Sequence, residues 1–253
     1  MNAGGDCKGR VAVVTGGGQG LGREVARQLA EAGFSVAVIG RTKSKLDDTV
    51  ALIGAHALAV AADLTDSHAT RSAFAAIAAR FGGVDVLVNN AANYFPFRVD
   101  EASDEEIDAV VSGTLIAPIY CIREAIPLMR VRGGGDILNV SSQSVQVPQP
   151  FLTVYSAAKA GLDTLAQGLR YELKGENFRI ITFQVGAIAE TSAGALWTPE
   201  LIKRVTQGFE KAGIAGYYSV PGASVKNLAA AILNALTAPR EICAQVIEMR
   251  TTT

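Results

Sequence analysis

Cysteine and histidine are scarce in this sequence of 253 residues. The three cysteines, Cys7, Cys121 and Cys243, are odd in number and far apart. Their placement argues against a disulfide framework and favours a reducing, cytoplasmic location. The two histidines, His56 and His68, have no partners at metal-ligand spacing, so no metal site is predicted.

Strong net charge and long apolar runs are missing as well. The 23 Lys and Arg residues almost balance the 24 Asp and Glu residues, which gives a net charge of −1. This balance argues against a surface for nucleic acid or for an anionic membrane. No run of 18 apolar residues is present, and the start MNAGGDCKGR lacks the apolar core of a signal peptide. We therefore expect neither nucleic acid nor a membrane as a partner.

The sequence does contain a regular alternation of short apolar strands and longer helical segments. The expected strands are 10–15, 35–40, 56–61, 84–90, 136–142 and 178–185, and the expected helices are 21–33, 43–53, 67–80, 103–130 (interrupted near Pro118) and 153–174. This alternation predicts an α/β fold with one doubly wound parallel sheet and helices on both faces. With no linker, residues 1–253 are expected to form a single domain. An irregular insertion at about 187–222 would follow a strand's carboxyl end, where such sheets bind ligands.

The glycine-rich stretch TGGGQGLG at 15–22 lies between the first strand and the first helix. A flexible linker would not be flanked so tightly by a buried strand and an amphipathic helix. Gly16 would permit a sharp turn, Gly20 would let the backbone approach a pyrophosphate, and Gly22 would let the helix pack closely on the strand. The helix N-terminus would add unpaired N–H groups that favour a phosphate. The stretch therefore predicts nucleotide binding.

The second strand ends in Gly40 and Arg41, where an NAD site prefers an acidic residue for the ribose. Arg41 would instead meet a 2′-phosphate, with Thr42 and Lys43 nearby, so the sequence favours NADP(H) over NAD(H). A solvated surface arginine is the alternative. Gln19 in the turn is not basic, so a second charge for the phosphate is missing there.

A second cluster follows the fifth strand. Tyr155 and Lys159 lie four residues apart on one helix face, and Ser142 ends the strand before them. A neighbouring ammonium lowers the pKa of a phenol, and such a tyrosine exchanges a proton with a carbonyl or alcohol oxygen. Ser142 would hydrogen-bond the same oxygen, while a nicotinamide would carry the hydride. The alternative is a chance match within an ordinary helix.

Taken together, these motifs resemble the short-chain dehydrogenase/reductase family over nearly the whole length. The matching elements are TGGGQGLG at 15–22, Asp63 in ADLTD, NNAA at 89–92, NVSS at 139–142 and YSAAK at 155–159. The resemblance implies a Rossmann sheet of about seven strands and a homotetramer or homodimer. It makes Tyr155 the general acid/base, Lys159 the residue that lowers its pKa and binds the nicotinamide ribose, and Ser142 the residue that orients the carbonyl.

The resemblance also completes a set of cofactor-binding residues, in which Asp63 and the backbone of Leu64 contact the adenine. The full set is Gly16, Gln19, Gly20, Leu21, Gly22, Arg41, Thr42, Asp63, Leu64, Asn89, Ala91, Tyr155, Lys159, Gly186 and Ile188.

Four positions depart from the family pattern. Ala92 replaces the glycine of NNAG, and Thr114 stands where the family has an asparagine that bends a helix and holds a relay water. We include Thr114 among the catalytic residues because its hydroxyl would hold the same water. Val185 replaces the proline of Pro-Gly, and the end CAQVIEMRTTT lacks the usual Gly-Gly. Glu190 replaces a threonine, so we expect either that Glu190 points away from the pyrophosphate or that Thr191 takes the role of that threonine.

Aromatic and amide side chains near the site would wall a mostly apolar pocket, although core packing and subunit contacts explain such residues equally well. They are Tyr94, Phe95, Pro96, Phe97, Gln143, Gln146, Val147, Phe151, Leu196, Trp197, Phe209, Tyr217 and Tyr218. We expect an oxidoreductase that transfers hydride between NADP(H) and a neutral, moderately hydrophobic ketone, aldehyde or secondary alcohol, with the insertion as a mobile lid. The alternative is a catalytically impaired nucleotide-binding member that acts as a sensor or scaffold. The intact Ser142, Tyr155 and Lys159 favour the enzyme.

Overall fold

A parallel sheet organises the computed structural model, which describes residues 7–189, 197–215 and 221–251. Within these residues the sheet has seven strands in the order β3-β2-β1-β4-β5-β6-β7, and every neighbouring pair is parallel. The strands are β1 (Val11–Thr15), β2 (Ser35–Gly40), β3 (Ala57–Ala61), β4 (Val86–Asn89), β5 (Gly135–Ser142), β6 (Phe178–Val185) and β7 (Val246–Met249). The predicted doubly wound sheet is confirmed.

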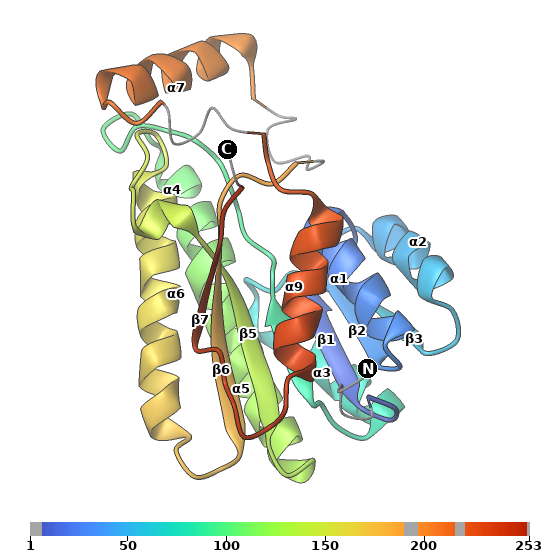
Figure 1. The fold of residues 1–253 in the computed structure, drawn as a ribbon. Coiled ribbons are helices and arrows are strands. Elements are labelled where there is room, and N and C mark those ends of the chain that lie inside the picture. The colour runs from blue at the N-terminus through green and yellow to red at the C-terminus, as the bar shows by residue number, and fades with distance from the viewer. Residues whose placement is uncertain (1–6, 190–196, 216–220, 252–253) are drawn as a thin grey trace.

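Helices cover both faces of this sheet (Figure 1). They are α1 (Gly20–Glu31), α2 (Lys43–Ile53), α3 (Ser67–Phe81), α4 (Asp104–Val111), α5 (Ala117–Val131), α6 (Thr153–Glu172), α7 (Pro199–Lys211) and α9 (Val225–Thr237). One core packs the sheet against α1 and α9, and a second core packs it against α3, α5 and α6. The central strands are therefore buried on both sides, which explains why they are apolar throughout.

Three elements, α7, α9 and β7, lie outside the sequence-based prediction. The insertion is not wholly irregular, because the 13-residue α7 lies within it. Figure 1 shows α7 beyond the carboxyl ends of the strands. The strand β7 is short and half-exposed, so its apolar signal is weak. It is paired with β6 from Thr182–Val246 to Val185–Met249.

The long helical segment after β4 is interrupted by a π-helical turn, η1 (Ser112–Ile116). The interruption was expected near Pro118, and it lies just before that proline, which is the second residue of α5. An 18-residue window of the combined run Asp104–Val131 has a mean hydropathy of 1.4, so by length and composition alone this run could cross a membrane. Buried core helices pass the same test, and α5 contributes Cys121 to the core under the sheet.

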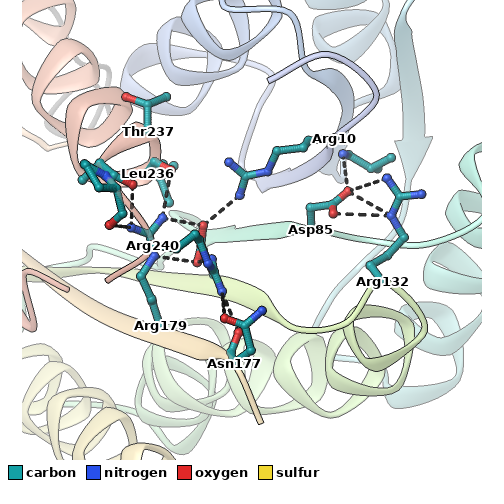
Figure 2. A network of polar contacts seen from close by, with 12 residues as sticks. Arg10, Asp85, Arg132, Asn177, Arg179, Leu236, Thr237 and Arg240 are labelled. Atoms are coloured by element: carbon teal, nitrogen blue, oxygen red, sulfur yellow. Dashed lines mark hydrogen bonds and ion pairs between the residues drawn. The ribbon is translucent and has the colours of Figure 1, made fainter. Parts of the chain in front are cut away.

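A network of arginines fixes the amino-terminal edge of the sheet (Figure 2). The carboxylate of Asp136, on β5, is fully buried and is bound by Arg10 at 2.9 Å, by Arg179 at 2.8 Å and by Arg240. Burial raises the pKa of Asp136, but the hydrogen bonds and charges of these arginines outweigh it and hold the pKa below its ordinary value. The network ties β1, β5, β6 and the segment after α9 together at the edge opposite the site described below.

Candidate active site

The glycine turn after β1 opens onto a cleft of about 800 Å³, here called the main cleft. Gly16 has a φ of +66° and Gly20 a φ of +53°, both in the left-handed region that favours glycine. A Cβ on Gly20 would meet no atom within 4 Å, so the first residue of α1 borders open space in the main cleft. A Cβ on Gly22 would instead overlap the Gly16 carbonyl, which shows how closely α1 packs on the turn.

The structure gathers most of the predicted cofactor residues around the main cleft. Its lining includes Gly16, Gln19, Gly20, Leu21, Gly22, Arg41, Thr42, Asp63, Leu64, Ala91 and Ile188. Three further predicted residues, Tyr155, Lys159 and Gly186, line an adjoining cavity of about 470 Å³, here called the inner cavity. Ile188 borders both spaces, so the two open side by side at the carboxyl edge of the sheet.

Asn89 does not line either space, which corrects its predicted place in the cleft. Its side chain is 2% exposed and donates to Asn139 Oδ1 at 2.9 Å from the paired position on β5. The next residue, Asn90, lines both the main cleft and the inner cavity. Its amide donates to the Thr15 carbonyl at 2.9 Å, and its backbone N–H donates to Thr15 Oγ1. Thr15 thus holds the loop that separates the two spaces.

Asp63 lies on the wall of the main cleft next to β3. The backbone N–H of Thr65 donates to Asp63 Oδ1 at 3.0 Å, and the Thr65 hydroxyl donates to the same oxygen at 2.8 Å. These bonds, with the charge of Arg41, lower the pKa of Asp63 against the opposing effect of burial. The carboxylate is therefore ionised, held in place, and able to accept a hydrogen bond from a ligand amine through its second oxygen.

The basic end of the main cleft contains Arg41 and a second cation that the sequence reasoning missed. Lys45 lines the cleft, and its Nζ donates to Gln19 Oε1 at 2.6 Å. Lys43, expected near a phosphate, instead pairs with Asp47 at 2.8 Å on the outer face of α2. Arg41 precedes α2 and Lys45 lies in its first turn, and both line the main cleft.

Tyr155 lies in the wall of the inner cavity, and its hydroxyl shares a hydrogen bond with Ser142. The expected lowering of its pKa is not found: burial raises the pKa of Tyr155 to about 12, although the Ser142 bond acts to lower it. Lys159 explains the difference, because its Nζ lies 5.8 Å from the Tyr155 ring centroid and donates to the Val140 carbonyl at 2.5 Å. The ammonium lies close enough to face the ring, but it is directed at the backbone.

Lys159 is itself perturbed. The side chain is 2% exposed, and burial lowers its pKa to about 8, while the negative charge of Asp163 one turn later opposes that shift. Asp163 accepts a hydrogen bond from Gln184 Nε2 at 2.8 Å. Gln184 in turn accepts a bond from Gln146 at 2.8 Å, so a chain of polar groups runs from beside Lys159 toward β7.

Thr114 is fully buried in the π-helical turn. Its hydroxyl donates to the Asn93 carbonyl and accepts from the Asn93 N–H, both at 3.3 Å. The structure thus places Thr114 against the loop after β4, while its neighbour Gly113 lines the main cleft. The proposed relay water at Thr114 stays a prediction.

Aromatic side chains form one side of the inner cavity. Tyr94 meets the Tyr155 ring edge-on at 5.1 Å and stacks on Trp197 at 5.5 Å, and α7 adds Val205 and Phe209. Four of the expected pocket residues line this cavity, namely Tyr94, Gln143, Trp197 and Phe209, and Phe95 lines the main cleft. The others pack or bond elsewhere: Phe97 lies in a core cluster and Phe151 packs on Gly208. The Gln146 side chain bonds Gln184 and Glu248. Glu190, Thr191, Leu196, Tyr217 and Tyr218 lie outside the described residues. Gln149 and Val205 line the cavity without having been predicted.

Comparisons with known proteins agree with this geometry. A family model described as short chain dehydrogenase matches residues 10–200. An oxidoreductase of Sarocladium schorii is 33% identical over 181 residues, which is 72% of this chain and 73% of its own. The 3-ketoacyl-(acyl-carrier-protein) reductase of Brucella melitensis, solved with NADH, superposes with a TM-score of 0.81 at 26% identity, covering 95% of this chain and 96% of its own. Serine dehydrogenase, solved with NADP+, shares the fold at 23% identity and a TM-score of 0.81, covering 94% of each chain.

Proposed function

Because the chain belongs to the short-chain dehydrogenase family, we propose that it transfers hydride between NADP(H) and a neutral carbonyl or alcohol, with Tyr155 as general acid/base. The observation that carries the proposal is the Ser142–Tyr155 pair in the wall of a cavity that adjoins a glycine-lined cleft. Nothing among the described residues favours the alternative of a non-catalytic sensor or scaffold.

The main cleft fits a dinucleotide from end to end. The open space at Gly20 in front of the α1 N-terminus suits a pyrophosphate, whose charge the N–H groups and helix dipole stabilise. The ordered carboxylate of Asp63 suits the amino group of an adenine. At the other end, Ile188 borders both the main cleft and the inner cavity that contains Tyr155, where a nicotinamide would supply or accept the hydride.

The side chains of this protein would handle the proton. In reduction, the Tyr155 hydroxyl donates its proton to the substrate oxygen as the carbonyl carbon gains the hydride, and the Ser142 hydroxyl donates a hydrogen bond to that oxygen. In oxidation the phenolate takes the alcohol proton, so each direction moves one hydride and one proton. The positive charge of Lys159 beside the ring favours the phenolate, which offsets part of the cost of ionising a buried tyrosine.

The pair of cations at the rim supports NADP(H) over NAD(H). No hydrogen bond or ion pair holds the Arg41 guanidinium among the residues that the structure describes, and Lys45 lies beside Gln19 in the same wall. A 2′-phosphate would meet both charges, whereas a bare ribose hydroxyl would meet no carboxylate at the end of β2.

A screen of ketones, aldehydes and secondary alcohols with NADPH, NADH and their oxidised forms tests the proposal, with the absorbance of the reduced nicotinamide as readout. We expect turnover with at least one carbonyl and a higher kcat/KM for NADPH. Tyr155→Phe should abolish turnover and leave NADPH binding within about threefold, since only the proton donor is lost. Turnover that survives this substitution would contradict the assigned mechanism.

A further inference from the structure

Two buried carboxamides in the inner cavity have no role in the mechanism above. Gln143 is 6% exposed and Gln149 is 8% exposed, and both line the cavity. Neither side chain makes a hydrogen bond to protein in the part of the chain that the structure describes, although each has two donors and two acceptor sites. Their amide groups are not among the fully buried polar atoms that lack a partner, so they reach the space of the cavity and can hydrogen-bond a ligand that enters it.

Both glutamines are held near the reacting centre. Gln143 follows Ser142 directly and begins the 3-10 turn η2 (Gln143–Val145). A Cβ on Gly186 would approach Gln143 Oε1 to 2.7 Å, so the glycine after β6 leaves the room that this carboxamide occupies. Gln149 lies on the loop before α6, and its backbone carbonyl accepts a bond from Leu152, whose segment leads into the helix of Tyr155.

The other residues that line the inner cavity limit which kinds of substrate it can bind. Tyr94 and Trp197 form an aromatic stack, and the buried indole Nε1 of Trp197 also lacks a hydrogen-bond partner. Lys159 is the only charged side chain among the described residues that line the cavity, and it bonds the Val140 carbonyl. A substrate with a second charge would find no counter-ion here, and a plain hydrocarbon chain would leave the carboxamides unpaired.

We propose that the substrate of this site is a neutral molecule with a second oxygen, a hydroxyl or carbonyl group, that Gln143 and Gln149 hydrogen-bond while its apolar part packs on Tyr94 and Trp197. The inference rests on the proposed function and restricts its neutral carbonyl or alcohol substrates to those that have a second oxygen. A carboxamide both donates and accepts, so it matches either kind of oxygen. The glutamines would fix which carbon faces the cofactor, because they anchor a point away from the reacting carbonyl.

Cyclohexanone and its three hydroxy-substituted isomers test this directly, because they differ only in the presence and position of the second oxygen. We expect kcat/KM for at least one hydroxyketone to exceed that for cyclohexanone by about tenfold, the effect of one or two neutral hydrogen bonds. Gln143→Leu and Gln149→Leu should each reduce this ratio by about threefold or more, mainly through KM, while kcat/KM for cyclohexanone changes little.

Gln146→Leu is the matched control. It lies on the same loop, but its exposed side chain bonds Gln184 and Glu248, so the ratio should not change. Equal NADPH affinity in all variants would show that they fold. A wild-type preference for cyclohexanone over every hydroxy isomer, or a ratio unaffected by both leucine variants, would overturn the inference while leaving the oxidoreductase intact. Absence of turnover with every carbonyl and both cofactors would overturn the proposed function, and this inference with it.

Discussion

Replacing Lys159 by methionine should stabilise the folded protein at neutral pH while it destroys the site. Methionine has a similar length, no charge and no donor, so it keeps the packing of a residue that is only 2% exposed. The native lysine lies in an environment that disfavours its own ammonium, because burial lowers its pKa from 10.5 to about 8. The buried lysine therefore lowers the free energy of unfolding at every pH at which Lys159 is protonated in the folded protein.

The size of the effect follows from this shift. At pH 7 the depressed pKa costs the folded state about 3 kcal/mol, since each pKa unit is worth about 1.4 kcal/mol. The variant loses the hydrogen bond from Lys159 to the Val140 carbonyl, a net loss of about 1 kcal/mol. We therefore expect Lys159→Met to raise the free energy of unfolding by about 2 kcal/mol at pH 7, or the Tm by about 4–8 °C.

The sign of the pH dependence distinguishes this explanation from improved packing. The unfolded chain keeps the lysine proton up to a pH near 10.5, whereas the folded chain releases it near 8. Between these values the unfolded state binds more protons, so wild-type stability rises with pH relative to the variant. The burial cost falls by about 2 kcal/mol between pH 7 and pH 9.5, and the advantage of the variant should disappear over that interval.

Urea unfolding of both proteins at the two pH values, at one protein concentration, measures this difference. Tyr155→Phe serves as a control, because burial raises the pKa of the native Tyr155 to about 12 and it stays neutral in the folded protein throughout. Its stability difference from wild type should be nearly constant with pH. The reasoning would be refuted if Lys159→Met were less stable than wild type at pH 7. It would also be refuted if the variant exceeded the wild type in stability by the same amount at both pH values.

Three further substitutions test the site. Arg41→Asp with Lys45→Ala should raise the KM for NADPH by at least tenfold more than that for NADH, and equal effects would remove the 2′-phosphate assignment. Thr114→Asn should preserve or raise kcat, because an amide can replace both hydroxyl bonds to the neighbouring loop, and a large loss would show that the helix is not arranged as the resemblance implies. Asp163→Asn should lower the pKa of Lys159 further, so the alkaline decline of kcat/KM should begin at a lower pH than in the wild type; an unshifted profile would contradict this role.

Most of the fold could be predicted from local patterns, because six of the seven strands are short apolar runs and the helices between them follow a helical period. The glycine turn was equally readable, since Gly16 and Gly20 adopt backbone angles that other residues avoid. The seventh strand was not, because β7 has only four residues and alternates between exposed and half-buried positions. The partner strand β6, not the sequence of β7, determines where it lies.

The sequence does not show which of two neighbouring residues of the same type directs its side chain toward the cleft. Asn89 and Asn90 are identical in type, but the strand register directs the first into the sheet and leaves the second at the cleft. Lys43 and Lys45 differ in the same way, because two residues of helix rotate the first toward Asp47 and the second toward the glycine turn. In both cases the direction of the side chain, which distinguishes two neighbours in the chain, required the three-dimensional structure.

Thr114 stands where the family has an asparagine, and in this structure another carboxamide, that of Asn93, lies beside the same π-helical turn. A π-helical turn leaves carbonyls of the preceding helix without their usual partners. The Asn93 amide donates to the Ala109 carbonyl at 2.7 Å, and the missing Cβ of Gly113 leaves room for that amide. Thr114 in turn holds both backbone polar groups of Asn93. A carboxamide from the loop after β4 thus binds a carbonyl of the helix that precedes the π-helical turn, and Thr114 holds the backbone of that same loop.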